Sequence, residues 1–121
     1  MTATRRDPHE ELPLHPLEFR ILLVLLSGPN HGYEIVKEIE RRERYGPIYP
    51  ANLYRRIRDL LARELIEEVS VSPGTLLEAR RRHLAVTAWG RKVARAEAAR
   101  LEELVREARA GRLLPTTGGA R

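Results

Sequence analysis

The chain has 121 residues, of which 42% are hydrophobic, contains no cysteine and carries a net charge of +5. This length suits one domain with a modest core, or a domain that completes its core by dimerising, and the lack of cysteine excludes disulfides, thiolate metal sites and cysteine nucleophiles. The longest apolar run, residues 21–26, is too short to span a bilayer, and residues 1–13 lack the apolar core of a signal peptide. We therefore expect a cytoplasmic protein without a membrane partner.

Two helices are predicted in the first third of the chain, after a loose, polar arm over residues 1–12. The first helix is expected over residues 16–27, because Pro16 suits a first turn and the apolar residues that follow recur at helical spacing. The turn signal that begins at Gly28 should end it. The second helix is expected over residues 31–44, again from the spacing of its apolar residues.

The third helix, expected over residues 50–64, is the most informative element. Its apolar residues follow an i, i+4, i+7, i+8 spacing and define one buried face. At about 100° per residue, the opposite face carries only small, polar or charged side chains. These are Ala51, Asn52, Arg55, Arg58, Asp59 and Ala62, with Tyr54 and Arg56 at the edges. A face of this kind suits the major groove of double-stranded DNA.

A β-hairpin should follow the third helix. Residues 66–72 are rich in β-branched side chains and predict a strand, residues 73–80 a loop, and residues 81–86 the returning strand. A short hairpin after three helices forms the wing of a winged helix-turn-helix. Arg81 and Arg82 on that wing are expected to bind DNA phosphates, largely without regard to sequence.

A long last helix is predicted over residues 87–110, with Thr87 as its N-cap and a disordered tail over 111–121. Small and apolar residues recur along it at the 4-3-4-3 spacing of a packing seam. They are Ala94, Ala98, Leu101, Val105 and Ala108. Because two heptads are too few for a free-standing coiled coil, we expect this seam to pack on a partner. The fold class is thus mainly α (α+β): a winged helix-turn-helix over residues 13–86 and a C-terminal dimerisation helix.

The distribution of charge agrees with this interpretation. Residues 1–40 carry four basic and seven acidic side chains, whereas residues 41–63 carry seven arginines against two acids, and residues 80–90 add three arginines and no acid. Two basic blocks are what binding to a polyanion needs, although basic surfaces also serve solubility. Of the 22 basic residues, 20 are arginine, which favours bidentate bonds to phosphate and guanine but could equally reflect genome composition.

The order of these elements resembles the PadR family of bacterial transcriptional regulators. The resemblance covers about residues 12–110, and its combination of motifs is more specific than any one of them. The motifs are LHPLEF at 14–19, GPNHGYEI at 28–35, IYPANLYR at 48–55, LIEE at 65–68, RRHLAVT at 81–87 and the glycine at 90.

The resemblance implies a homodimer of the family's short subclass, in which the single C-terminal helix packs on the partner. Two recognition helices would then bind a pseudo-palindromic operator, usually with repression as the outcome. Many relatives are released by a small aromatic or cationic effector, which the residues here do not identify. The resemblance also implies phosphate contacts by Tyr33 and Tyr54, although each could instead be a core residue with an exposed tip. The family's usual wing aromatic is His83 here, either a packed wing residue or a phosphate contact.

The side-chain types of the third helix indicate which further residues are candidates for DNA contacts. Arg55 and Arg58 are the first candidates for base or phosphate contacts. Asn52 could reach an adenine or a phosphate, and Arg56 either a flanking phosphate or only solvent. Trp89 is expected in the core.

Other function classes have weaker support. The four histidines are scattered, and no metal-ligand pair, phosphate loop or nucleophile elbow occurs, so we expect no enzyme, no catalytic residues, no metal and no cofactor. A winged helix can also serve as a protein–protein interaction module without specific DNA binding. The exposed arginines of the third helix favour DNA.

Overall fold

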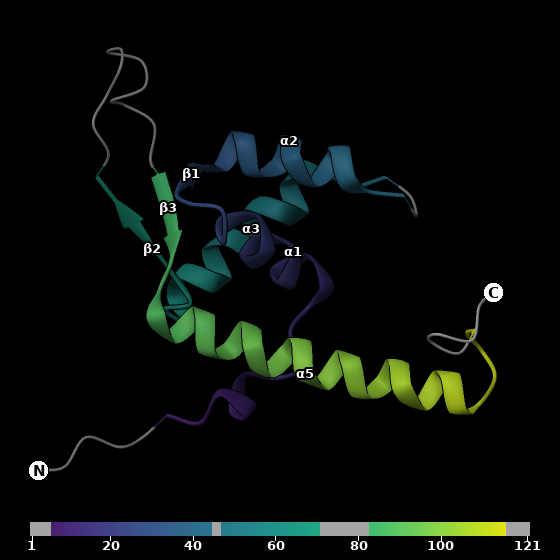
Figure 1. Cartoon of the computed structure of the whole chain (residues 1–121). Coiled ribbons are helices and arrows are strands. Elements are labelled where there is room, and N and C mark those ends of the chain that lie inside the picture. Colours follow the sequence, from purple (N-terminus) through teal and green to yellow (C-terminus); the bar gives the residue numbers. More distant parts are fainter. Residues whose placement is uncertain (1–5, 45–46, 71–82, 116–121) are drawn as a thin grey trace, which may run out of the picture.

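The computed structural model of the chain describes residues 6–44, 47–70 and 83–115 (Figure 1). It confirms a mainly helical fold with a small antiparallel sheet. In chain order the elements are the 3₁₀ helix η1 (Pro8–Glu11), α1 (Pro16–Leu25), β1 (Asn30–His31), α2 (Gly32–Arg42), α3 (Pro50–Ala62), β2 (Ile66–Val69), β3 (His83–Val86) and α5 (Ala88–Ala110). None of the described helices is both long and apolar enough to cross a membrane.

Capping bonds determine where α1 begins. The Nδ1 atom of His15 accepts a hydrogen bond from the main-chain N–H of Leu17 at 3.1 Å, and the Glu18 carboxylate accepts one from the main-chain N–H of His15, also at 3.1 Å. This reciprocal arrangement is a capping box, and it satisfies two main-chain donors at the start of the helix. The helix ends two residues earlier than predicted, just before Gly28, whose φ of 136° an L side chain rarely adopts.

The hydrophobic core lies around α1, which contacts α2, α3, α5 and β3. Its most deeply buried residues come from α1, α2, α3 and α5, and from the start of β2 with the residue before it. They are Ile21, Leu22, Leu25, Ile35, Ile39, Leu53, Leu60, Leu65, Ile66 and Val93. One apolar face on each of α2 and α3 supplies its share of this set, as the sequence spacing predicted.

The sheet has the order β1-β3-β2 and is antiparallel throughout. Strand β3 pairs with β2 from Ile66 opposite Val86 to Val69 opposite His83, as expected of the hairpin. Strand β1, which the sequence did not predict, pairs His31 with His83 on the other edge of β3. The predicted hairpin loop, and the parts of the two predicted strands next to it, lie outside the described residues.

The N-terminal segment differs from the predicted loose arm. Residues 8–11 form η1, which contacts α5, and Leu12 packs against the core. The Arg6 guanidinium lies 4.3 Å from the centroid of the Trp89 ring and 3.1 Å from a carboxylate oxygen of Glu64. Trp89 itself packs on the core, as predicted. Arginine over an indole ring is a favourable cation–π contact, and the polar composition of the arm did not reveal it.

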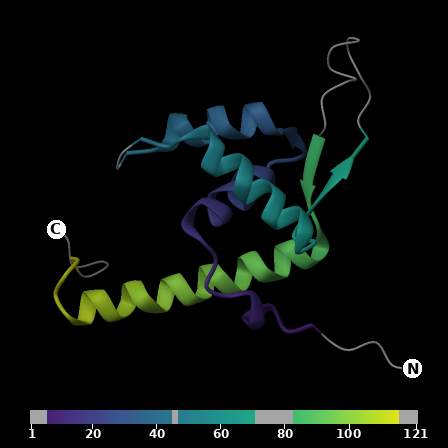
Figure 2. The same ribbon diagram turned by 180° about the vertical axis from the view of Figure 1, so that it is seen from behind.

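The C-terminal half of α5 extends beyond the other helices (Figures 1 and 2). Apolar side chains on this half are exposed, with Leu104 at 46% and Val105 at 36% of full exposure. The helix ends at Ala110 as predicted. Part of the predicted tail bonds back to it, because the main-chain N–H of Leu113 donates to the carbonyl of Ala108 at 2.8 Å.

Candidate nucleic-acid interface

Helix α3 exposes the face that the sequence spacing predicted. Leu53, Ile57 and Leu60 are buried, and the exposed positions on the other side include Ala51, Asn52, Arg55, Arg58 and Ala62. Among the residues that the structure describes, Arg55 and Arg58 form no ion pair. Two guanidinium groups on one exposed helix face therefore remain available for a ligand.

The start of α2 packs directly on α3 through Gly32. A Cβ atom added to Gly32 would lie 3.1 Å from Cε1 of Tyr54, so a larger residue would require the Tyr54 ring to shift by a few tenths of an ångström. The glycine of the His-Gly-Tyr motif therefore lies in close contact with α3. This contact also brings Tyr33, which is 53% exposed, to the same end of the molecule as the 38% exposed ring of Tyr54. The ammonium group of Lys37 lies 5.7 Å from the centroid of the Tyr33 ring.

Arg56, predicted to reach a flanking phosphate or solvent, has a protein partner. Its Nη1 atom lies 3.5 Å from Oε2 of Glu18, a glutamate on α1 that is only 2% exposed. The Arg56 side chain is itself 30% exposed. No local pattern indicates this pair, because its members lie 38 positions apart in the chain.

Arg63, the C-cap residue of α3, bonds to three acidic side chains. Its guanidinium bonds to Glu18 at 3.1 Å, to Asp59 at 2.9 Å and to Glu11 at 2.9 Å. Burial on its own would lower the pKa of Arg63, but the bonds to Asp59, Glu11 and Glu18 raise it. The pKa of Asp59 is lowered, with the neighbouring Glu18 carboxyl and the bond from Arg63 as the main causes. The network thus joins the N-terminal segment and α1 to α3.

A tight junction connects the end of α3 to the start of α5. The Thr87 hydroxyl donates to the carbonyl of Glu64 at 2.8 Å and accepts from the main-chain N–H of Gly90 at 2.8 Å. The main-chain N–H of Thr87 donates to the carbonyl of Leu65 at 3.1 Å. A Cβ atom on Gly90 would lie 2.0 Å from that same carbonyl oxygen. The Thr-x-x-Gly motif therefore has a packing explanation that the sequence alone did not provide.

The wing residues are described only in part. Arg81 and Arg82 lie outside the described residues, so their predicted phosphate contacts stay a prediction. His83 lies in β3, where its ring packs edge-to-face on that of His31, with centroids 5.5 Å apart and ring planes at 89°. Within the described residues, no group of three His, Asp or Glu side chains could hold a metal ion.

The predicted seam on α5 is divided between the core and the surface. Ala94 is buried within the protomer, Leu101 and Ala108 are half-buried, and Ala98 and Val105 are exposed. Leu23 and Leu26 share the helical spacing of the apolar residues in the first predicted helix, yet they are 40% and 43% exposed. They lie beside α5, where a hollow of about 260 Å³ is lined by Leu23, Leu26, Ala94 and Ala98 among others.

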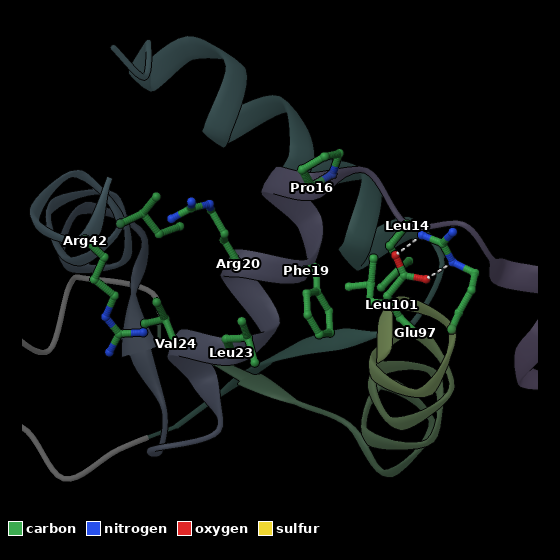
Figure 3. A pocket seen from close by; sticks show the side chains of 11 residues that line it. Leu14, Pro16, Phe19, Arg20, Leu23, Val24, Arg42, Glu97 and Leu101 are labelled. Carbon is green, nitrogen blue, oxygen red and sulfur yellow. Dashed lines mark hydrogen bonds and ion pairs between the residues drawn. The ribbon is translucent and has the colours of Figure 1, made fainter. Parts of the chain in front are cut away.

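A larger pocket, of about 410 Å³, adjoins this surface (Figure 3). Side chains from α1, α2 and α5 line it, including Phe19, Leu23 and Leu101. Its charged members are Arg20, Arg42, Glu97 and Arg100. Glu97, which is 2% exposed, accepts two hydrogen bonds from Arg100 at 2.7 and 2.8 Å, so its charge is neutralised within the wall of the pocket.

Three helices, a cationic exposed face on the third and an antiparallel hairpin after it define a winged helix. The chain belongs to the Transcriptional regulator PadR-like family, whose model matches residues 21–96. This is a family of transcriptional regulators, not of enzymes. A comparison with curated proteins finds no match.

Solved structures share the fold. A PadR family transcription regulator from hypervirulent Clostridium difficile has a TM-score of 0.67 at 18% identity, covering 79% of this chain and 97% of that one. A transcriptional regulator from Clostridium thermocellum has a TM-score of 0.65 at 23% identity, covering 78% and 87%. Bacillus subtilis PadR, solved in complex with operator DNA, has a TM-score of 0.57 at 22% identity, covering 69% of this chain and 47% of that one.

Proposed function

We propose that this regulator binds a pseudo-palindromic operator in double-stranded DNA as a homodimer and represses transcription. The observation that carries the proposal is the exposed face of α3, on which Arg55 and Arg58 have no ion-pair partner among the described residues. The structure of Bacillus subtilis PadR with operator DNA supports it, since that protein has the same fold. Each protomer would place α3 in a major groove.

The proposed contacts divide into base readout and phosphate binding. Arg55 and Arg58 would reach base edges or phosphates, because a guanidinium can bond to O6 and N7 of guanine together or to a phosphate. Asn52 would reach an adenine or a phosphate. The hydroxyls of Tyr33 and Tyr54 would bind phosphates. Further phosphate contacts would come from Arg56, through N–H groups that Glu18 does not use, and from the wing residues Arg81 and Arg82.

Selection of bound fragments from sheared genomic DNA tests this function. At about 150 mM salt, where non-specific attraction is screened, the protein should recover a few sites that share an inverted repeat with half-sites about one helical turn apart. Arg55→Ala should weaken binding to such a site by about 1–3 kcal/mol and relax the preference at one base pair. Lys92→Ala, which removes an exposed cation from α5, is the matched control and should leave that preference unchanged.

Recovery of all fragments or of none would count against specific DNA recognition. It would favour a winged helix that binds a protein partner. An unchanged operator affinity in Arg55→Ala would remove this residue from the readout.

The proposed homodimer uses the apolar surface that α1 and α5 share. Exposed leucines on α1 adjoin the seam of α5, and the projecting half of α5 carries further exposed apolar side chains, as expected of an interface. We expect Leu101→Glu to give a monomer with poor operator binding, because a carboxylate cannot be buried there without a partner. Ala99→Glu adds the same charge at an exposed position on the other side of α5 and should leave a dimer. Sedimentation velocity distinguishes the two, and a Leu101→Glu dimer would place the interface elsewhere.

The proposal includes a small-molecule effector. The pocket of about 410 Å³ between α1, α2 and α5 falls within the size range of small-molecule sites and adjoins the proposed interface. A ligand in it would touch both the recognition domain and the dimerisation helix, and so could change how the two are arranged.

A further inference from the structure

A small recess lies where the start of α1 meets the N-terminal half of α3. Its volume is about 150 Å³, and its lining residues are His15, Leu17, Asn52, Arg55 and Arg56. This volume is well below the range of about 300–1,000 Å³ that is usual for drug-sized ligands. It suits a single small polar group.

The side chains that line the recess offer hydrogen-bond donors to an anion. Among the described residues, the Arg55 guanidinium and the Asn52 side chain bond to no neighbour. Arg56 uses Nη1 for Glu18 at 3.5 Å, which leaves most of its five N–H donors. No carboxylate lines the recess. The chemistry therefore favours a phosphate group over a cation or a neutral ligand.

The capping bonds of α1 determine what His15 can offer. Its Nδ1 atom accepts the N–H of Leu17 and so carries no proton. A neutral imidazole then carries its proton on Nε2, which makes the remaining ring nitrogen a donor. The ring is half-buried, and the cap holds its orientation.

Glu18 lies close to the recess, but its negative charge is already compensated by other bonds. Its oxygens accept bonds from the main-chain N–H of His15 and from Arg63, both at 3.1 Å, and it pairs with Arg56 at 3.5 Å. It does not line the recess. An incoming phosphate would therefore meet the donors without facing an unpaired carboxylate.

We propose that this recess binds one backbone phosphate of the operator, and that His15 is a DNA contact made from α1. The inference rests on the proposed function. Arg55 and Asn52 belong both to the groove-facing side of α3 and to the wall of the recess, so the phosphate would be one that flanks the groove read by α3. Seating that phosphate would fix the register of α3 on the duplex, since phosphate contacts position a protein without reading sequence.

The variant His15→Ser tests the proposed phosphate contact of His15 independently of its role as the N-cap of α1. Serine is a preferred N-cap residue, so the variant should keep the start of α1 but lacks the ring donor. We expect its unfolding temperature to match that of the native protein and its operator affinity to fall about tenfold, in line with the loss of one hydrogen bond to a charged group. His15→Ala should lose the same affinity and, in addition, thermal stability.

A methylphosphonate scan identifies the phosphate itself. Each operator duplex carries one uncharged backbone linkage. At one position flanking the groove, the native protein should lose about tenfold in affinity, whereas His15→Ser should lose little more than it has already lost. Addition of sodium phosphate at constant ionic strength should not reduce this difference, because the site takes a phosphodiester held in register.

Three results would overturn the inference. Equal losses for the native protein and His15→Ser at every position would remove the contact while leaving the proposed function intact. Competition by sodium phosphate would make the recess a site for the free anion. Failure of the native protein to bind any duplex would overturn both the inference and the proposed function.

Discussion

Gly90→Ala is expected to lower the free energy of unfolding by about 3 kcal/mol or more, in the upper range of overpacking changes. The new Cβ atom would lie 2.0 Å from the carbonyl oxygen of Leu65, 2.9 Å from its carbonyl carbon and 2.9 Å from Cγ2 of Val86. Two of these atoms belong to the main chain, so no rotamer change can relieve the overlap. Either β2 or α5 must move, and the hydrogen bonds of Thr87 move with them. Urea denaturation measures the loss.

Gly111→Ala is the matched control at the other end of α5. A Cβ atom there would come no closer than 3.4 Å to any atom, and the φ of Gly111 is −83°, which alanine adopts freely. We expect its stability to stay within about 0.5 kcal/mol of the native value. Similar stabilities for the two variants would show that the junction between β2 and α5 tolerates displacement.

Arg63→Met is expected to destabilise the protein by about 3 kcal/mol. The substitution keeps much of the apolar stem of the side chain. It leaves Glu18, which is 2% exposed, with the main-chain N–H of His15 and with Arg56, 3.5 Å away, as its remaining cationic partner among the described residues. A buried carboxylate without adequate compensation carries a large desolvation cost. Adding Glu18→Gln should recover part of the loss, since the amide carries no charge. Equilibrium unfolding of the single and double variants measures this coupling.

Arg106→Met is the control for this substitution. It removes the ion pair between Arg106 and Glu103, whose side chains are 66% and 59% exposed, respectively. Exposed pairs of this kind contribute about 0–1 kcal/mol to stability. A loss in Arg63→Met no larger than in Arg106→Met would show that Glu18 does not depend on Arg63.

The features that the sequence predicted correctly follow from the repeat of apolar residues along a helix and from capping bonds between near neighbours. The faces of α3 follow from the 3.6-residue repeat, and Thr87 caps α5 through a bond to a residue three positions away. The order of the helices and strands follows from such signals too. All of them are contained in short stretches of chain.

What the sequence did not predict depends on contacts between distant segments. Strand β1 has two residues, too few to show alternation, and its partner β3 lies more than fifty residues later. The pairing of Arg56 with Glu18 and the docking of η1 on α5 have no local signature either. Leu23 and Leu26 share the helical spacing of the buried residues but are exposed. Because the first helix is apolar on more than one face, spacing alone could not select the buried one.

Strand β1 also joins two regions that are proposed to touch DNA. His31 pairs with His83 in the wing strand β3, and its Nδ1 accepts the main-chain N–H of Glu34 at 3.4 Å to cap α2. The first turn of α2, with Tyr33, is thereby attached to the base of the wing through sheet hydrogen bonds. If both regions bind phosphates, the span between those phosphates is determined by the protein. The regulator would then favour sequences whose groove width matches this span, even at base pairs that no side chain reaches.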